Sequence, residues 1–219
     1  MDEEDRAPFA VHLVGNFDSV GEEARHGPVP STGGTCAPPR GVVEGGAMAD
    51  LTFSFATIDD VPRVTALVEL AYRGAMAAKG WTNETAILEG PRTSPDEIER
   101  LVRDPRSRFL MAIQDGRLAA CCLLQQYGEG AYFGMFAVDP NLQQQGLGKD
   151  MVSHSEEAVK VLWKAKFLRL TVISLRDALI AWYQRRGFAL TGEHEPFPFD
   201  EAPGALRTDF DLVVLQKPL

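Results

Sequence analysis

The stretch AVDPNLQQQGLGKDMV, Ala137 to Val152, has the outline of a strand, a glycine-containing loop and the start of a helix. The first backbone N–H groups of a helix have no partner within the helix, and the helix dipole favours an anion at that end. Gly146 and Gly148 would let the backbone approach a ligand closely and adopt positive φ. The stretch therefore predicts a phosphate-binding loop, although three glutamines stand where more glycine is expected.

Two familiar nucleotide-binding loops do not match this stretch. A Walker-type loop needs Ser or Thr after Lys149, where Asp150 stands, and it needs glycine at the position of Gln143. A dinucleotide-binding fold places G-x-G-x-x-G directly after its first strand, whereas this loop comes late in the chain. By itself the loop is equally compatible with an ordinary connection between a strand and a helix.

Composition narrows the class of protein. The 219 residues are 45% hydrophobic and 24% charged, which indicates one soluble globular domain with some extra length. A net charge of −9 argues against nucleic-acid binding, and no apolar run approaches the ~20 residues of a membrane span. The three cysteines lack the spacing of a disulfide framework, so we expect reduced thiols and a cytoplasmic protein. Adjacent Cys121 and Cys122 are expected to pack on opposite faces of one buried strand.

Residues 1–47 differ in texture from the rest. They contain eight glycines, five prolines, and eight acidic against three basic residues, without sustained periodicity. Such a segment buries too little apolar surface to offset the entropy lost on ordering, and it resembles neither a secretory signal nor a transit peptide. We therefore expect a disordered or linker-like extension over 1–47 and one folded domain over 48–219.

Hydrophobic periodicity predicts the elements of the domain. Ser94 is the expected N-cap of a short helix with Pro95 at its first position, and Asp115-Gly116 is a hairpin turn. One long helix should carry Leu147, Met151, Ala158 and Leu162 along one stripe. The expected strands cover 51–57, 108–113, 117–127, 131–138, 167–174, 188–193 and 208–219, and the expected helices cover 57–76, 94–104, 147–166 and 176–187. The order β-α-α-β-β-β-α-β-α-β-β indicates a single mixed α/β domain.

Two motifs resemble the GNAT acyltransferase superfamily. AVDPNLQQQGLGKDMV is similar to its acyl-CoA signature, Q/R-x-x-G-x-G/A, with Gln143, Gly146 and Gly148 at the three defining positions. ALIAWYQRRGF, residues 178–188, resembles its second motif, an amphipathic helix with a tyrosine followed by Gly-Phe at the start of a strand. Smaller features, among them AYRG, GWTNE, GPRT and TGEHEPFP, resemble one subgroup. The resemblance implies a mixed, mostly antiparallel central sheet flanked by helices.

The resemblance also implies acetyl-CoA as cofactor. Its pyrophosphate would lie on the loop amides, and its pantetheine would pair with a strand edge. In the signature, Gln144 replaces a frequent glycine, while Arg176 stands where many relatives have Asn and could instead be a solvated helix start. The implied cofactor-binding residues are Phe136, Ala137, Val138, Gln143, Gln144, Gln145, Gly146, Leu147, Gly148, Lys149 and Arg176.

For catalysis, the resemblance implies direct attack by an amine of a small molecule or peptide. Tyr183 matches the residue that protonates the leaving thiolate, although its ring could merely pack on the sheet. Glu84 and Glu193, or Glu195, are candidates for the general base, with a solvent-facing carboxylate as the plainer interpretation.

Several alternatives stay open. A non-catalytic acyl-CoA sensor would keep the loop without turnover, and a metal-dependent variant would bind metal through His194 and Glu84, although we expect no metal. Residues 1–47 could instead serve as a partner-binding module. Trp81, Phe197 and Phe199 could line an acceptor site, and the C-terminal strands could form a homodimer.

Overall fold

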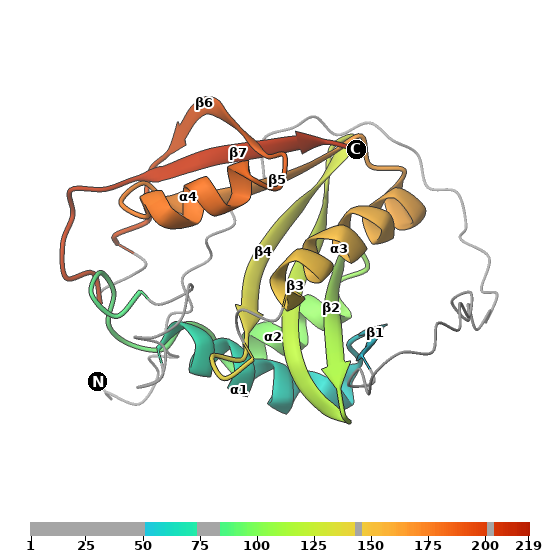
Figure 1. Ribbon diagram of the computed structural model, residues 1–219. Coiled ribbons are helices and arrows are strands. Elements are labelled where there is room, and N and C mark those ends of the chain that lie inside the picture. The colour runs from blue at the N-terminus through green and yellow to red at the C-terminus, as the bar shows by residue number, and fades with distance from the viewer. Residues whose placement is uncertain (1–50, 74–83, 143–145, 201–203) are drawn as a thin grey trace.

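A computed structural model describes residues 51–73, 84–142, 146–200 and 204–219. Its strands form one sheet in the order β1-β2-β3-β4-β5-β7-β6, in which β4 and β5 are parallel and the other neighbours are antiparallel. This mixed fold and its element order confirm the prediction (Figure 1). The elements are β1 (Leu51–Phe55), η1 (Ile58–Asp60), α1 (Val61–Tyr72), α2 (Pro95–Arg103), β2 (Ser107–Gln114), β3 (Arg117–Tyr127), β4 (Gly130–Val138), α3 (Leu147–Trp163), β5 (Phe167–Ile173), α4 (Asp177–Gln184), β6 (Ala189–Glu195) and β7 (Leu212–Pro218).

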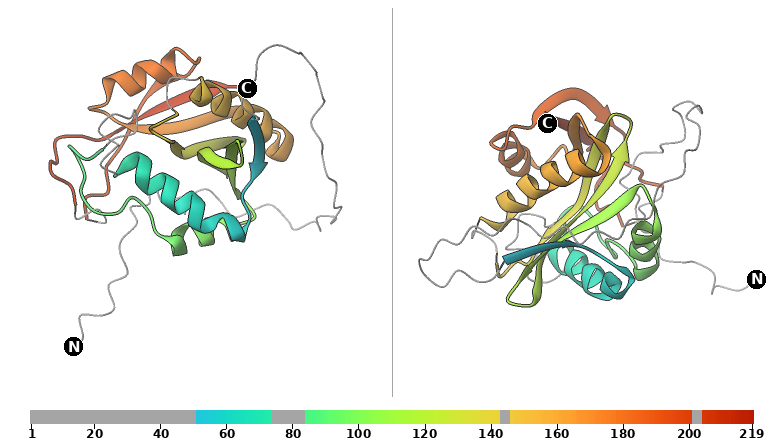
Figure 2. Two further views of the ribbon diagram at one scale, coloured as in Figure 1. Left: turned by 60° about the horizontal axis from the view of Figure 1, so that its bottom comes forward. Right: turned by 90° about the vertical axis from the view of Figure 1, so that its right-hand side faces the viewer.

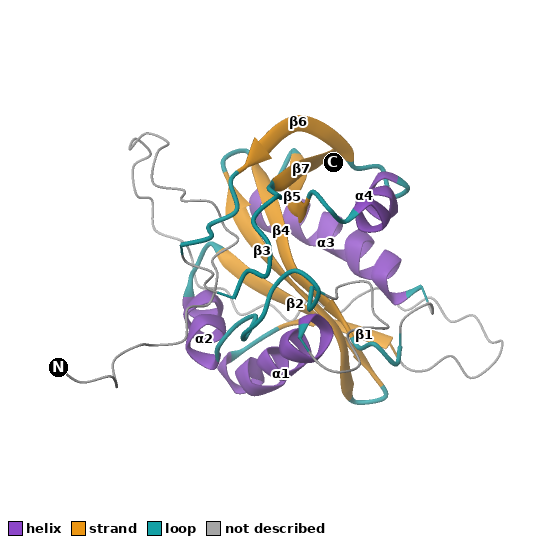
Figure 3. Cartoon of the chain, turned by 90° about the vertical axis from the view of Figure 1, so that its left-hand side faces the viewer, coloured by secondary structure: helices purple, strands orange, loops and turns teal. Residues whose placement is uncertain are grey.

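The sheet is covered on both faces, with α1 and α2 on one side and α3 and α4 on the other (Figures 2 and 3). Each side has its own hydrophobic cluster. Cys121 packs with α1 and α2, while Cys122 packs with α3, and both are fully buried. The prediction that these two side chains face opposite ways is therefore confirmed. Burial raises the pKa of both thiols, to about 12 for Cys122.

The helix starts follow from local capping chemistry. The Ser94 side chain accepts a hydrogen bond from the Glu97 amide at 3.2 Å, with Pro95 at the first position, as predicted. By contrast, α1 begins at Val61 rather than at residue 57. Asp60 accepts a hydrogen bond from the Thr57 amide at 2.7 Å, which holds the preceding turn as the short 3₁₀ helix η1.

A bulge in β4 changes which side chains face each helix layer. The register with β3 shifts between Cys121 and Leu123, and Met135 has a φ of 42°. As a result Phe133 and Phe136, three residues apart, both face the α3 and α4 side. Extra residues of this kind bend a strand and redirect its side chains. The bulge lies close to the point at which β4 stops pairing with β5, its partner on the other edge.

The pairing of β4 with β5 is short. It covers Ala131 with Leu168 and Tyr132 with Arg169, after which the two strands diverge (Figure 1). In the described part of the chain, the carboxyl half of β4 has a strand partner only on its β3 edge. The divergence therefore leaves a strand edge in the middle of the sheet.

Beyond the divergence, β5 is central and mostly buried, as its continuous apolar sequence predicts. The last strand, β7, lies between β5 and β6, so β6 forms the sheet edge. A third cluster covers this end of the sheet: Leu88, Ile173, Phe197, Phe210 and Leu212, with Phe199 packed against it. Among the described residues, no helix has both the length and the apolar character to cross a membrane.

Candidate functional site

The predicted phosphate loop ends in a helix start of the expected kind. Gly146 caps α3 with a φ of 86°, a left-handed conformation that favours glycine. Its carbonyl accepts hydrogen bonds from the amides of Lys149, at 2.8 Å, and Asp150, at 3.2 Å. The Lys149 amide is thus used within the first turn, which leaves the preceding amides of Leu147 and Gly148 at the open end of the helix. Gln143, Gln144 and Gln145 lie outside the described residues.

The position of Gly148 has little room for a side chain, because an aromatic ring lies close to it. A Cβ at this position would be 3.1 Å from Cζ2 of Trp182 and 3.6 Å from Cζ of Phe136. The Trp182 and Phe136 rings are themselves 6.1 Å apart, and the Arg186 guanidinium lies 3.3 Å from the Trp182 ring centroid. The start of α3 is therefore packed directly against α4 and the bulged part of β4.

The edge of β4 that faces away from β3 can be assigned from its hydrogen bonds. The Asp139 amide donates to the Ala119 carbonyl at 2.9 Å, so Asp139 faces β3. Backbone groups alternate along a strand, which turns those of Ala137 toward β3 and those of Phe136 and Val138 toward the opposite edge. The Phe136 carbonyl accepts a hydrogen bond there from the Tyr72 hydroxyl at 3.1 Å. An extended ligand such as pantetheine fits an edge of this kind.

Tyr183 lies in the core beside this edge. Its ring is 5% exposed and makes edge-to-face contacts with Phe133, Trp182 and Phe188. Burial raises the pKa of Tyr183 well above its usual value; the nearby Tyr72 hydroxyl adds to this rise and Arg176 opposes it. The Tyr183 ring contacts Phe133, and Tyr72 bonds to Phe136 from the α1 side, so both phenols lie beside the part of β4 that has separated from β5. The Tyr183 hydroxyl is consequently protonated at neutral pH.

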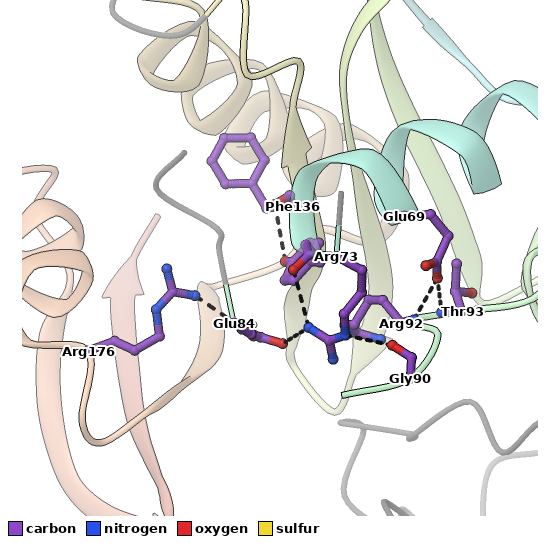
Figure 4. A network of polar contacts seen from close by, with 9 residues as sticks. Glu69, Arg73, Glu84, Gly90, Arg92, Thr93, Phe136 and Arg176 are labelled. Carbon is purple, nitrogen blue, oxygen red and sulfur yellow. Dashed lines mark hydrogen bonds and ion pairs between the residues drawn. The ribbon is translucent and has the colours of Figure 1, made fainter. Parts of the chain in front are cut away.

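A buried ionic network joins the end of α1, the segment around Glu84 and the loop before α4 (Figure 4). The Glu84 carboxylate lies between Arg73, with Nη1 at 2.9 Å, and Arg176, with Nη1 at 3.8 Å. The Glu84 side chain is 6% exposed and that of Arg176 is 12% exposed. A solvent-facing Glu84 and a solvated Arg176 were therefore the wrong interpretations. A buried carboxylate requires charged partners of this kind because desolvation penalises it.

Glu193 and Glu195 occupy a different place, on β6. Both accept hydrogen bonds from Nη2 of Arg169, at 2.8 Å and 3.0 Å. The Glu193 side chain is 59% exposed, and the hydrogen bond from Arg169 lowers its pKa. The predicted acids therefore belong to two separate groups, one buried and one at the surface.

The residues considered for a metal are dispersed. His194 bonds through Nδ1 to the Asp211 carboxylate at 2.7 Å. Within residues 51–73, 84–142, 146–200 and 204–219, no group of three or more His, Cys, Asp or Glu side chains could hold a metal ion. The Phe197 and Phe199 rings both pack against the Phe210 ring. Trp81 lies outside the described residues.

Sequence reasoning missed the other members of the network. Tyr72 and Arg73 belong to the AYRG feature and Arg92 to GPRT, but nothing in the local pattern assigned them a role. The Glu69 carboxylate accepts hydrogen bonds from the amides of Arg92, at 2.6 Å, and Thr93, at 2.7 Å, which ties that segment to α1. AYRG and GPRT were the only sequence features that could have pointed to this network, since each places an arginine in a segment predicted as a loop or a helix end.

Solved structures of acetyltransferases share this fold. The chain aligns with the ribosomal-protein-S18-alanine N-acetyltransferase of Escherichia coli at 22% identity and TM-score 0.55, covering 77% of this chain and 93% of that one. An N-acetyltransferase of Staphylococcus aureus Mu50 aligns at 15% identity and TM-score 0.60, covering 78% and 98%. The IAA acetyltransferase of Bacillus cereus aligns at 17% identity and TM-score 0.58, covering 78% and 100%. At such identities the likeness shows the fold alone.

Sequence comparison adds the family. No curated protein matches the chain. The model of the acetyltransferase (GNAT) family matches residues 76–188, more than half of the chain, and includes the start of α3, the bulged strand β4 and Tyr183. This chain belongs to the GNAT family of acetyltransferases.

Proposed function

We propose that the protein transfers an acetyl group from acetyl-CoA to an amine of a small molecule or peptide. The observation that carries this proposal is the position of Tyr183, whose buried, protonated phenol lies beside the strand edge left by the divergence of β4 and β5. An edge for an extended thioester and a proton donor next to it are the two parts that direct acyl transfer requires.

The cofactor would be bound mainly by backbone groups. The diphosphate would lie against the segment from Gln143 to Lys149, where the Leu147 and Gly148 amides stand at the positive end of α3. The pantetheine would extend along Phe136–Val138, with the groups of Phe136 and Val138 turned toward it and Ala137 paired with β3. Arg176 would serve the reaction less through the cofactor than through its pairing with Glu84.

In the reaction, residues of the chain would donate one proton to the leaving sulfur and accept one proton from the amine. The amine nitrogen attacks the thioester carbon, a C–N bond forms and the C–S bond breaks, and Tyr183 donates its proton to the leaving sulfur. The proton that the amine loses passes to a carboxylate, directly or through water, and afterwards restores Tyr183. The products are an amide and free CoA thiol, so neither an oxidant nor a covalent enzyme intermediate is required.

By position, Glu84 is the better candidate than Glu193 for receiving that proton. Glu84 contacts Arg176, whose charge acts on Tyr183, and it lies close enough to Tyr72 to affect its pKa. Glu193 is exposed, and its lowered pKa makes it a weaker base. Glu84→Gln should lower kcat without weakening the binding of acetyl-CoA if Glu84 accepts the proton. An unchanged kcat would restrict Glu84 to holding its arginines.

The test of the function has two arms. Calorimetry with acetyl-CoA should show saturable binding, and release of CoA thiol should follow when a panel of primary amines is added. Binding without release for any amine would favour an acyl-CoA sensor. Absence of binding to well-folded protein would overturn the proposal altogether.

The domain division and the assembly state complete the proposal. We assign acyl transfer to residues 48–219, so a chain that begins at Met48 should retain the thiol-release rate of the full chain. A homodimer through the C-terminal strands would have to use β6, because β7 is paired on both edges. Light scattering on the purified protein would test that arrangement.

A further inference from the structure

Arg92 is a buried cation with unused donors. The residue is 5% exposed, and its Nε and Nη1 atoms have no hydrogen-bond partner among the described residues. Its guanidinium carbon lies 5.1 Å from the centroid of the Tyr72 ring, a cation–π contact that offsets only part of the cost of burial. Buried guanidinium groups ordinarily find acceptors for their N–H donors, because an unsatisfied charged donor is expensive. Within the described residues, the Nε and Nη1 donors of Arg92 therefore have no acceptor.

The protein's own nearby carboxylates are engaged elsewhere. Glu84 is held by Arg73 and Arg176, and Glu69 accepts hydrogen bonds from two backbone amides, those of Arg92 itself and Thr93. The backbone of Arg92 is thereby fixed to α1, while the Nε and Nη1 donors of its side chain remain unsatisfied. Figure 4 shows Arg92 and Thr93 at the Glu69 carboxylate, which accepts hydrogen bonds from their amides.

Arg92 also lies next to the reaction site proposed above. Arg92 contacts the ring of Tyr72, whose hydroxyl donates a hydrogen bond to the carbonyl of Phe136, on the edge of β4 that faces away from β3. The Arg92 charge also acts on the buried Tyr132 phenol, which belongs to the last pair before β4 and β5 diverge. A ligand anion at Arg92 would accordingly be next to the place where the thioester is expected.

We propose that Arg92 binds a carboxylate of the acceptor, so that the amines acetylated are amino acids or peptides with a free carboxylate. This inference rests on the proposed function for the identity of the acceptor. A carboxylate supplies both the charge and the acceptor oxygens that the guanidinium lacks. The amine of the same molecule would then reach toward the thioester from the α1 side of the sheet, opposite Tyr183.

The kinetic test compares acids with amides. Thiol release is measured for a panel of amino acids and dipeptides and for the same compounds as C-terminal amides. Wild-type protein should prefer the best acid over its amide by about 10²-fold in kcat/KM, since a charge-assisted bond to a buried group is lost with the amide. The amino-acid and dipeptide arms separate a free amino acid from a peptide terminus as the source of the carboxylate.

Variants assign that preference to Arg92. Arg92→Met should reduce the acid-to-amide ratio to about 1, and Arg92→Lys should retain part of it. The exposed Arg103 gives a matched control, because Arg103→Met removes a surface pair with Glu99 and should leave the ratio unchanged. Comparing ratios between proteins cancels the lower basicity of the amide amines. A ratio that is the same in wild type and Arg92→Met would overturn the inference.

Thermal unfolding separates a binding role from a structural one. Removing an uncompensated buried charge should leave the melting temperature of Arg92→Met unchanged or higher. A marked fall in that temperature, together with an unchanged acid-to-amide ratio, would show that Arg92 only supports the fold.

A binding arm keeps this inference distinguishable from the proposed function. Calorimetry with N-acetylated amino acids and their amides, on full-length protein with and without CoA, needs no turnover. Acid-selective binding that Arg92→Met abolishes would support the carboxylate site even if no amine were acetylated. Acetylation of amines without acid selectivity in either assay would uphold the function and refute the site.

Discussion

The two sides of the sheet differ at the point where β4 and β5 separate. On the α3 and α4 side, the groups that face the divergence are backbone amides and aromatic rings, with Tyr183 as the polar member. On the α1 side they are charged side chains: Arg73, Glu84, Arg92 and Arg176. The first side presents mainly backbone groups to the proposed cofactor, whereas the second presents charges to the proposed acceptor.

The difference shows how each kind of site is encoded. The amides at the start of α3 come from one continuous stretch, whose glycines satisfy a positive φ at Gly146 and a close contact at Gly148. The charged network joins the end of α1, the segment around Glu84 and Arg92, and the loop before α4. The proposed cofactor site can therefore be encoded locally, whereas the proposed acceptor site is assembled from distant segments.

The largest expected effect concerns the charged side. Glu84→Ala leaves Arg73 and Arg176 buried without their carboxylate, and it should lower the free energy of unfolding by about 3 kcal/mol. Denaturation with urea would measure this change. Glu193→Ala is the matched control, since its carboxylate is exposed, and it should cost about 0.5 kcal/mol. Equal losses in both variants would mean that burial does not distinguish the two groups.

The next effect concerns the aromatic side. Tyr183→Phe removes the proposed proton donor but preserves the packing of the ring, so kcat should fall by about 10²-fold. The affinity for acetyl-CoA and the melting temperature should not change. Tyr127→Phe, at a tyrosine ring that contacts Phe167 away from the divergence, should stay within about twofold of the wild-type rate. A near-wild-type rate for Tyr183→Phe would remove this residue from the mechanism.

Alkaline pH should lower the free energy of unfolding through buried groups on both sides of the sheet. Burial raises the pKa of Tyr72, Tyr132, Tyr183, Cys121 and Cys122 above their ordinary values. Above about pH 9 the unfolded chain therefore loses protons that the native state retains, and the free energy of unfolding must fall as pH rises. Each group contributes about 1.4 kcal/mol per pH unit within its window, which for Cys122 extends to about pH 12.

Urea titrations at pH 7, 9, 10 and 11 would measure that decline. Cys122→Ala should make the slope shallower, because one of the contributing groups is absent. A free energy of unfolding that stays constant up to pH 11 would contradict the burial of these groups.

The smallest expected effect tests the close contact at the start of α3. Gly148→Ala places a methyl group 3.1 Å from the Trp182 ring, which must move by a few tenths of an ångström. We expect a cost of about 1 kcal/mol in the free energy of unfolding. Denaturation with urea would measure the change. Trp182→Phe in the same background should relieve the contact, and failure to recover stability would point to the backbone instead.

Some local predictions proved wrong for equally local reasons. The long helix α3 ends at Trp163, because Lys164 adopts a left-handed conformation with a φ of 55°. Its buried face contains Leu147, Met151 and Val159, while Leu162, expected on the buried stripe, is 37% exposed. Apolar spacing identified the helix but did not decide which of two overlapping stripes would face the sheet.

The sequence by itself determined the order of elements, the cap at Ser94, the opposite burial of Cys121 and Cys122, and a helix start preceded by glycine. Each of these follows from residues that are neighbours along the chain, through periodicity, capping and φ. Only the tertiary structure decided that Glu84 is buried between two arginines and that Arg92 is buried with unsatisfied donors. The physical reason is that the energy of a buried charge depends on the groups that the fold places around it, and those groups come from segments that are not neighbours along the chain.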